Sequence, residues 1–275
     1  MIDALKGLQR VVQKPLQAPL EFAERASAFS QLLATLEGIS PKERRFGGIN
    51  DWDYTKYLFN SGGGISDAGV REIFVRCLAT ARIGASVVLL LPTGNNTRLV
   101  ASSVSALSYL LGNRYTINGS DGAEQYSAII LASSALGRID GGKNRDLAVD
   151  FIAAQTAFSY FVAGAVKSLG REWRNGTAVE RVVRTEVYGN RIFYRFLRRN
   201  PRLSESLTYS TVVVEMLFPF LLLHRGMRKV ALASMFAFHA ANVPLMGLGR
   251  FFIVFTSTYP AVMNSTNRLK GRFSD

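Results

Sequence analysis

The sequence is poor in the residues that form covalent and metal cross-links. It has one cysteine, Cys77, and two histidines among 275 residues. One cysteine cannot form an internal disulfide, and the cysteine and histidine positions have no spacing typical of a zinc site. Two histidines also exclude a His-rich metal centre. The N-terminal stretch lacks the apolar run of a cleaved signal peptide, so we predict none.

Apolar residues, by contrast, are abundant and unevenly distributed. They make up 48% of the chain, and the mean hydropathy is positive. They gather in six or seven blocks separated by short polar links, as membrane-spanning helices of roughly 20 residues require. We therefore predict an all-α, polytopic transmembrane helical bundle with six to seven spans.

The charge is strongly basic, with a formal net charge of +13. In a soluble protein this would indicate a nucleic-acid partner. Here the arginines and lysines cluster in the links between apolar blocks, above all from Arg171 to Arg202, which favours anionic lipid headgroups over nucleic acid. The positive-inside rule places this link and the N-terminus on the cytoplasmic side of the inner membrane.

Residues 1–65 differ in character from residues 66–275, and we predict a domain boundary between them. Apolar residues recur at helical spacing in the first segment, around Leu5 to Val12 and again from Phe22 to Leu36. Such amphipathic helices could lie on the cytoplasmic membrane face or form a helical cap on the bundle. The second segment, 66–275, is the predicted transmembrane domain.

Helix boundaries in the second segment follow from capping residues, proline and the limits of the apolar blocks. The predicted helices run from the Ser66-Asp67 cap to Leu91, and over Arg98–Leu111, Ala123–Leu136, Asp146–Leu169, Gly176–Arg199, Leu207–Leu223, Val230–Leu248 and Phe251–Met263. The helix over Gly176–Arg199 alternates basic and apolar residues, so we expect it to lie in the membrane interface.

Lys167 ends an otherwise apolar helix, TAFSYFVAGAVKSLG, and Trp173 follows at the wet boundary. Thr156, Tyr160 and Lys167 fall on one helical stripe. A desolvated lysine can lose its proton and serve as a base, and the hydroxyls could orient a substrate. Alternatively, Lys167 extends to the headgroups and the hydroxyls bond neighbouring helices.

Three further polar residues lie inside apolar helices. Glu215 in TVVVEMLFPFLLL must be protonated, paired or exposed to a wet cavity. His239 in SMFAFHAANVPL could relay protons or simply pack. Arg82 is costly in its helix unless it faces the bundle interior, where it could be the counter-ion of Glu215 or contact substrate. We predict a polar cluster of Lys167, Glu215 and His239.

The loop before the Ala123–Leu136 helix is acidic. Asp121 or Ser120 could cap the helix with Glu124 in its first turn. Alternatively Asp121, Glu124 and Gln125 could bind a cation or a basic peptide, so we count them with Tyr160, Trp173 and Arg82 as candidate substrate-binding residues. Their spacing is not that of a calcium loop.

Four segments in this order resemble the HTTM family, the membrane domain shared with vitamin K-dependent gamma-carboxylase and with SdpB-like bacterial maturation proteins. They are NGSDGAEQ, YFVAGAVKSLGREWRNGTA, EMLFP and FHAANVPLMGLGRFF, and the resemblance covers roughly Ser66 to Asn264. The carboxylase has paired lysines after the YF-AG pattern, whereas this chain has Lys167 followed by Ser168.

The resemblance implies that Lys167 is a base for a membrane-embedded, carboxylase-like peptide modification, with Glu215 or His239 as a relay. It implies a reduced quinone as a cofactor and a small secreted peptide or toxin precursor as the partner. The alternative is a non-enzymatic assembly factor that binds a peptide precursor or partner subunit, in which the charged residues only organise the helices.

Overall fold

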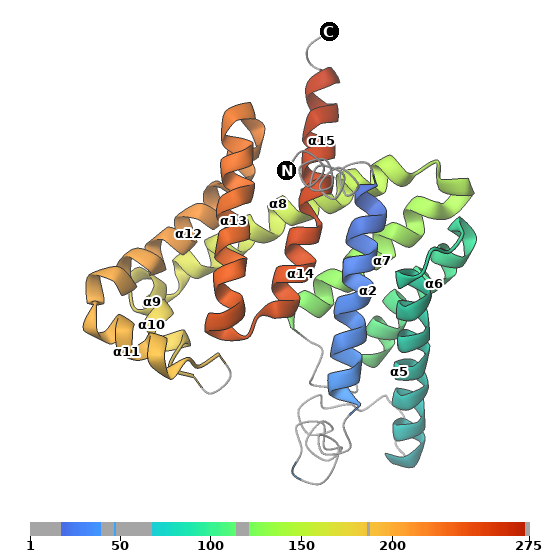
Figure 1. The fold of residues 1–275 in the computed structure, drawn as a ribbon, viewed down its shortest axis with the longest axis horizontal. Coiled ribbons are helices and arrows are strands. Elements are labelled where there is room, and N and C mark those ends of the chain that lie inside the picture. The colour runs from blue at the N-terminus through green and yellow to red at the C-terminus, as the bar shows by residue number, and fades with distance from the viewer. Residues whose placement is uncertain (1–17, 40–46, 48–67, 114–120, 186–187, 273–275) are drawn as a thin grey trace, which may run out of the picture. The chain divides into compact units, whose positions relative to one another are not determined.

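The computed structural model describes residues 18–39, 47, 68–113, 121–185 and 188–272. The described residues are helical and contain no strand, which confirms the predicted all-α class. The chain divides into two compact units, 1–151 and 152–275, and the long helix α8 (Arg145–Leu169) runs from the first into the second. Figure 1 shows the order of the helices.

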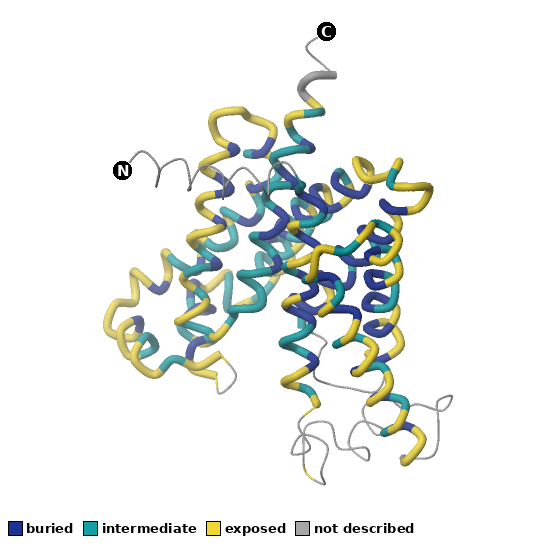
Figure 2. The backbone as a smooth tube through the Cα atoms, turned by 45° about the vertical axis from the view of Figure 1, so that its right-hand side comes forward, coloured by how far each residue is buried: buried dark blue, intermediate teal, exposed yellow. Residues whose placement is uncertain are grey.

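Four helices pack together among the described residues of the first unit. They are α2 (Pro19–Gly38), α5 (Ala68–Leu90), α6 (Asn95–Gly112) and α7 (Gly122–Arg138), and the short 3₁₀ turn η1 (Ile139–Gly142) follows. Small residues such as Ala28, Ala85 and Ala101 form the core with Leu89 and Leu131, which lets the helices approach closely. Buried and exposed residues alternate along these helices, as a period of 3.6 residues requires (Figure 2).

Helix α2 is a member of this packed unit. Pro19 occupies its first turn, where a missing N–H costs nothing, and Leu20 and Ala23 are buried. The helix packs against α5 and α7. Of the two interpretations of this segment, α2 fits a helix of the bundle rather than one that lies on a membrane face. The first predicted amphipathic stretch and the Ser66-Asp67 cap lie outside the described residues, and the boundary at residue 65 stays a prediction.

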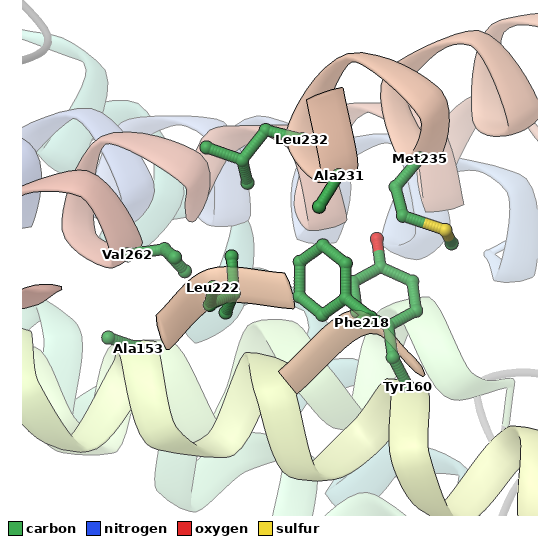
Figure 3. Close-up of a cluster of buried hydrophobic side chains, with 8 residues drawn as sticks. All are labelled: Ala153, Tyr160, Phe218, Leu222, Ala231, Leu232, Met235 and Val262. Carbon is green, nitrogen blue, oxygen red and sulfur yellow. The ribbon is translucent and has the colours of Figure 1, made fainter. Parts of the chain in front are cut away.

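In the second unit, the part of the chain that the structure describes contains the rest of α8 and seven further helices. They are α9 (Arg171–Arg174), α10 (Ala178–Val182), α11 (Arg191–Arg199), α12 (Pro201–Leu223), α13 (Arg225–Met246), α14 (Gly249–Ser257) and α15 (Tyr259–Arg272). Their core lies where α8, α12, α13 and α15 meet. Its buried side chains are Ala153, Tyr160, Phe218, Leu222, Ala231, Leu232, Met235 and Val262 (Figure 3).

Three helices within the described ranges are long and apolar enough to cross a membrane: Gly69–Leu90, Arg145–Leu169 and Pro201–Leu223. All three overlap predicted spans, and the third begins six residues before the predicted Leu207. The predicted total of six to seven spans is not confirmed.

Two predicted helices are wrong. Gly176–Arg199 is not one helix: α10 ends at Val182, and Asn190 starts α11 by accepting a bond from the Phe193 amide at 2.9 Å. The block Phe251–Met263 is divided between α14 and α15. The break lies at Thr258, and α15 begins at Tyr259. Pro260 therefore occupies the first turn of α15, where its missing N–H leaves no helical hydrogen bond unmade.

Candidate functional site

Lys167 and Glu215 form an ion pair between α8 and α12. The Lys167 ammonium donates to both carboxylate oxygens of Glu215, at 2.8 Å to Oε1 and 2.6 Å to Oε2. The Glu215 side chain is only 6% exposed and that of Lys167 is 25% exposed, so the pair is largely sheltered. A buried carboxylate without a partner is strongly disfavoured, and Lys167 therefore supplies the charge that Glu215 needs.

Gly164 brings these two helices close together. A Cβ at this position would lie 2.7 Å from Met216 Cγ and 3.0 Å from the Val212 carbonyl oxygen. Only glycine allows this approach without displacing the backbone of α12. One turn further along α8, the approach puts the Lys167 amine within reach of Glu215.

Trp173 lies beside Lys167 of this pair. The chain turns after Leu169, and α9 places the indole ring with its centroid 5.4 Å from Lys167 Nζ. A lysine at this distance from an aromatic face is attracted by the ring quadrupole. The predicted candidates Lys167 and Trp173 are thus brought together at the end of α8.

A second polar group lies deeper in the same unit. The Tyr160 hydroxyl lies 2.8 Å from His239 Nε2 and 3.0 Å from the Tyr259 hydroxyl. Phe255 stacks on the His239 ring at a centroid separation of 5.2 Å. If His239 carries its proton on Nδ1, Tyr160 donates to Nε2 and accepts from Tyr259, which forms a chain of three groups from α15 to α13.

These two groups line one cavity of ≈540 Å³, bounded entirely by the second unit. Most of its wall is apolar and aromatic, with contributions from Phe193, Phe238, Phe251 and Phe255. The polar side chains in the wall include Tyr160, Lys167, Thr211, Glu215, His239 and Asn242. The predicted cluster of Lys167, Glu215 and His239 therefore shares one apolar cavity that holds a few polar groups at fixed positions.

The remaining candidates belong to the first unit, where Arg82 and Asp121 both contact Glu124. Arg82 donates to Glu124 Oε1 at 2.9 Å and to Ser108 Oγ at 3.1 Å, whereas the counter-ion of Glu215 is Lys167. Asp121 caps α7 by accepting from the Glu124 amide at 2.8 Å, as the capping interpretation predicted. Gln125 is exposed on the next turn.

Sequence reasoning missed two features. Tyr259 was not singled out, because its partner Tyr160 lies 99 residues away and no local pattern joins them. It also missed a buried cluster in the first unit, where Glu24 accepts from Arg98 at 2.5 Å and Arg138 at 2.9 Å. The prediction for this segment used only its apolar spacing, and the polar Glu24 between those apolar positions faces the interior.

Comparison with known proteins identifies one family. Residues 146–265 match the family model of the HTTM domain. The matched region runs from the start of α8 into α15 and contains Lys167, Trp173, Glu215 and His239. No curated protein and no solved structure matched the chain. Together with the three apolar helices found among the described residues of the chain, the match indicates a membrane protein.

Proposed function

Since residues 146–265 belong to the HTTM family, we propose that this chain is a polytopic inner-membrane protein that modifies a small secreted peptide or toxin during its maturation. One observation carries the proposal. A titratable pair, Lys167 and Glu215, lies in the wall of an apolar cavity large enough for a ligand. Ionisable groups at such positions are costly to keep, which favours a role in chemistry.

Lys167 is the proposed base. While it pairs with Glu215 its amine is protonated and cannot accept a proton. Transfer of one proton across the 2.6 Å contact to Glu215 gives a neutral amine and a neutral carboxylic acid. The amine nitrogen then has a free electron pair that can take a proton from a substrate in the cavity. After this step the pair holds one proton more than at the start, and Glu215 releases its proton to the product or to water, which restores the ion pair.

His239 and Tyr160 are the proposed second relay. The Tyr160 hydroxyl bonds both His239 and Tyr259, so a proton can move along three groups without leaving the protein. Because Tyr160 and Lys167 lie on the same stripe of α8, both relays face the same cavity.

A reduced quinone fits the residues in the cavity wall. Phe251 and Phe255 offer flat apolar surfaces for a ring, and Lys167 and His239 offer polar groups at its edge. Such a group, when bound, supplies an ionisable hydroxyl. The chain's own contribution is to exclude water and to hold a base beside that hydroxyl.

The test compares two lysines in cells that secrete a candidate peptide precursor. We expect Lys167→Ala to abolish the change in peptide mass seen by mass spectrometry, while Lys229→Ala, on an exposed part of α13, preserves it. Because Lys167→Ala leaves Glu215 unpaired, the double variant Lys167→Gln/Glu215→Gln is the folding control. It removes both charges and should insert normally without activity. Unchanged maturation in Lys167→Ala rejects the catalytic assignment.

The second candidate function is a non-enzymatic assembly factor that binds a peptide precursor or a partner subunit. The contacts between Arg82 and Glu124, which organise helices and touch no cavity in the second unit, favour it. Under this function Glu215→Gln and Arg82→Gln lower the amount of folded protein, whereas Lys167→Ala leaves maturation intact. Mass spectrometry of the quinones and peptides retained by the purified protein separates the two candidates.

We also propose an orientation. The link from Arg171 to Arg202 and the N-terminus face the cytoplasm, where anionic headgroups neutralise the arginines. In this orientation the Lys167 end of α8 lies near the cytoplasmic surface.

A further inference from the structure

A second cavity lies in the same unit, on the other side of α10. It has a volume of ≈590 Å³, and its wall contains none of the candidate catalytic residues. The side chains that line it are Thr177, Glu180, Arg181, Arg184, Thr185 and Tyr194. Helix α10 therefore separates two cavities, because Val179 and Val182 on the same short helix line the apolar one.

The chemistry of this second cavity suits a phosphate group. Arg181 and Arg184 present planar guanidinium groups, which bind phosphate oxygens through two parallel hydrogen bonds. Arg184 is exposed and forms no ion pair with any residue that the structure describes. Arg181 is held by Glu172 at 2.9 Å, and both side chains of this pair are exposed to solvent. An incoming phosphate therefore meets one arginine directly and competes with Glu172 for the other.

The surroundings point to a lipid as the source of that phosphate. Residues 171–202 contain nine arginines and three glutamates. Helix α11, which provides Tyr194 to the cavity, also exposes apolar side chains: Ile192 is 82% exposed and Phe196 is 50% exposed. Basic groups beside exposed apolar side chains are typical of helices that contact a membrane surface. A free phosphate ion would make no use of the apolar side chains.

We propose that this cavity binds the phosphate headgroup of an anionic membrane lipid, between Arg181 and Arg184, with the acyl chains beside Ile192 and Phe196. The inference rests on the proposed placement of the Arg171 to Arg202 link at the membrane, and not on chemistry at Lys167. A lipid bound here touches the outer face of α10, whose inner face forms part of the wall of the candidate site.

The experiment titrates the purified full chain in detergent with short-chain phosphatidylglycerol, and native mass spectrometry counts the bound lipid. We expect Arg184→Gln to weaken binding about fivefold, the factor that one arginine contributes near an anionic surface. Arg199→Gln is the matched control, since it removes the same charge from the same link outside the cavity, and it should change binding less than twofold. Glu172→Gln should strengthen binding, because it frees Arg181.

Four results overturn the proposal. An equal loss of lipid binding in Arg184→Gln and Arg199→Gln means that the overall basic charge of the link attracts the lipid without a specific site. Weaker binding in Glu172→Gln contradicts the competition for Arg181. Full competition by inorganic phosphate at the lipid's own concentration makes free phosphate the ligand. If phosphatidylcholine binds the unchanged protein as well as phosphatidylglycerol does, the placement at an anionic surface fails together with the site.

Discussion

Removing the charge of Glu24 should be the most damaging conservative change in the first unit. Its Oε2 accepts from Arg98 at 2.8 and 2.5 Å and from Arg138 at 2.9 Å, and its Oε1 accepts from two serine hydroxyls. All three charged side chains are buried, so water cannot replace the carboxylate. Glu24→Gln leaves two arginines facing an amide, and breaking a buried ion pair in this way costs about 3–5 kcal/mol.

Thermal unfolding of the purified protein in detergent measures this cost. For a unit of this size each kcal/mol lowers Tm by about 2–4 °C, so we expect a fall of about 10 °C for Glu24→Gln. The control is Glu72→Gln, which removes the same charge from a pair with Arg76, an arginine whose side chain is 71% exposed. Exposed pairs contribute less than about 1 kcal/mol. Similar Tm values for the two variants would refute the assignment of Glu24 as a buried counter-ion.

The remaining predictions concern the helix contacts around the two candidate regions. Gly164→Ala should lower the free energy of unfolding by about 1–3 kcal/mol, because its new Cβ would lie 2.7 Å from Met216 Cγ. Gly84→Ala, with open space around it, should raise the free energy of unfolding slightly, and unfolding in denaturant measures both changes. Asp121→Ala should cost about 1 kcal/mol through loss of the α7 cap, and Gln125→Ala on the next turn should cost almost nothing in the same assay. Tyr160→Phe removes the hydroxyl that bonds both His239 and Tyr259, so we expect the free energy of unfolding to fall by about 1–3 kcal/mol. We also expect a changed His239 tautomer in the nitrogen NMR spectrum, and an unchanged spectrum would contradict the hydrogen bond.

The long apolar helices were predictable because their signal is local. The predicted limits of Asp146–Leu169 lie within one residue of those of α8, because a run of apolar residues and its polar ends determine both boundaries. For Leu207–Leu223 the predicted end is that of α12, but α12 begins earlier, at Pro201, because its first turns are polar and lie outside the apolar run. The helix breaks were not predictable from the same signal. The pattern of basic and apolar residues from 176 to 199 continues through the turn before Asn190, so periodicity alone reads one helix where the chain forms two.

Three polar residues singled out in the sequence, Lys167, Glu215 and His239, line one cavity, while their functional roles stay predictions and not all of their pairings were foreseen. Lys167 and Glu215 were singled out because each is expensive in an apolar helix, but nothing local shows that they neutralise each other across 48 residues. Arg82 was considered as the partner of Glu215 for the same reason. The need for a neutralising charge does not say which basic residue provides it. The close approach of α8 and α12 at Gly164 places Lys167 beside Glu215. The sequence alone does not show which helix packs against this glycine.

Glu24 and Glu215 show how the surroundings of a carboxylate limit its use. Glu24 accepts hydrogen bonds from two arginines and two serines, and arginine does not give up its proton in a protein, so this cluster can only hold charge in place. Glu215 instead pairs with a lysine, which can transfer a proton, and its pair borders a cavity. Replacing Lys167 by arginine should therefore preserve folding and abolish activity, since it keeps the charge and removes the transferable proton. Peptide maturation by Lys167→Arg at the level of the unchanged protein would show that Lys167 provides charge alone.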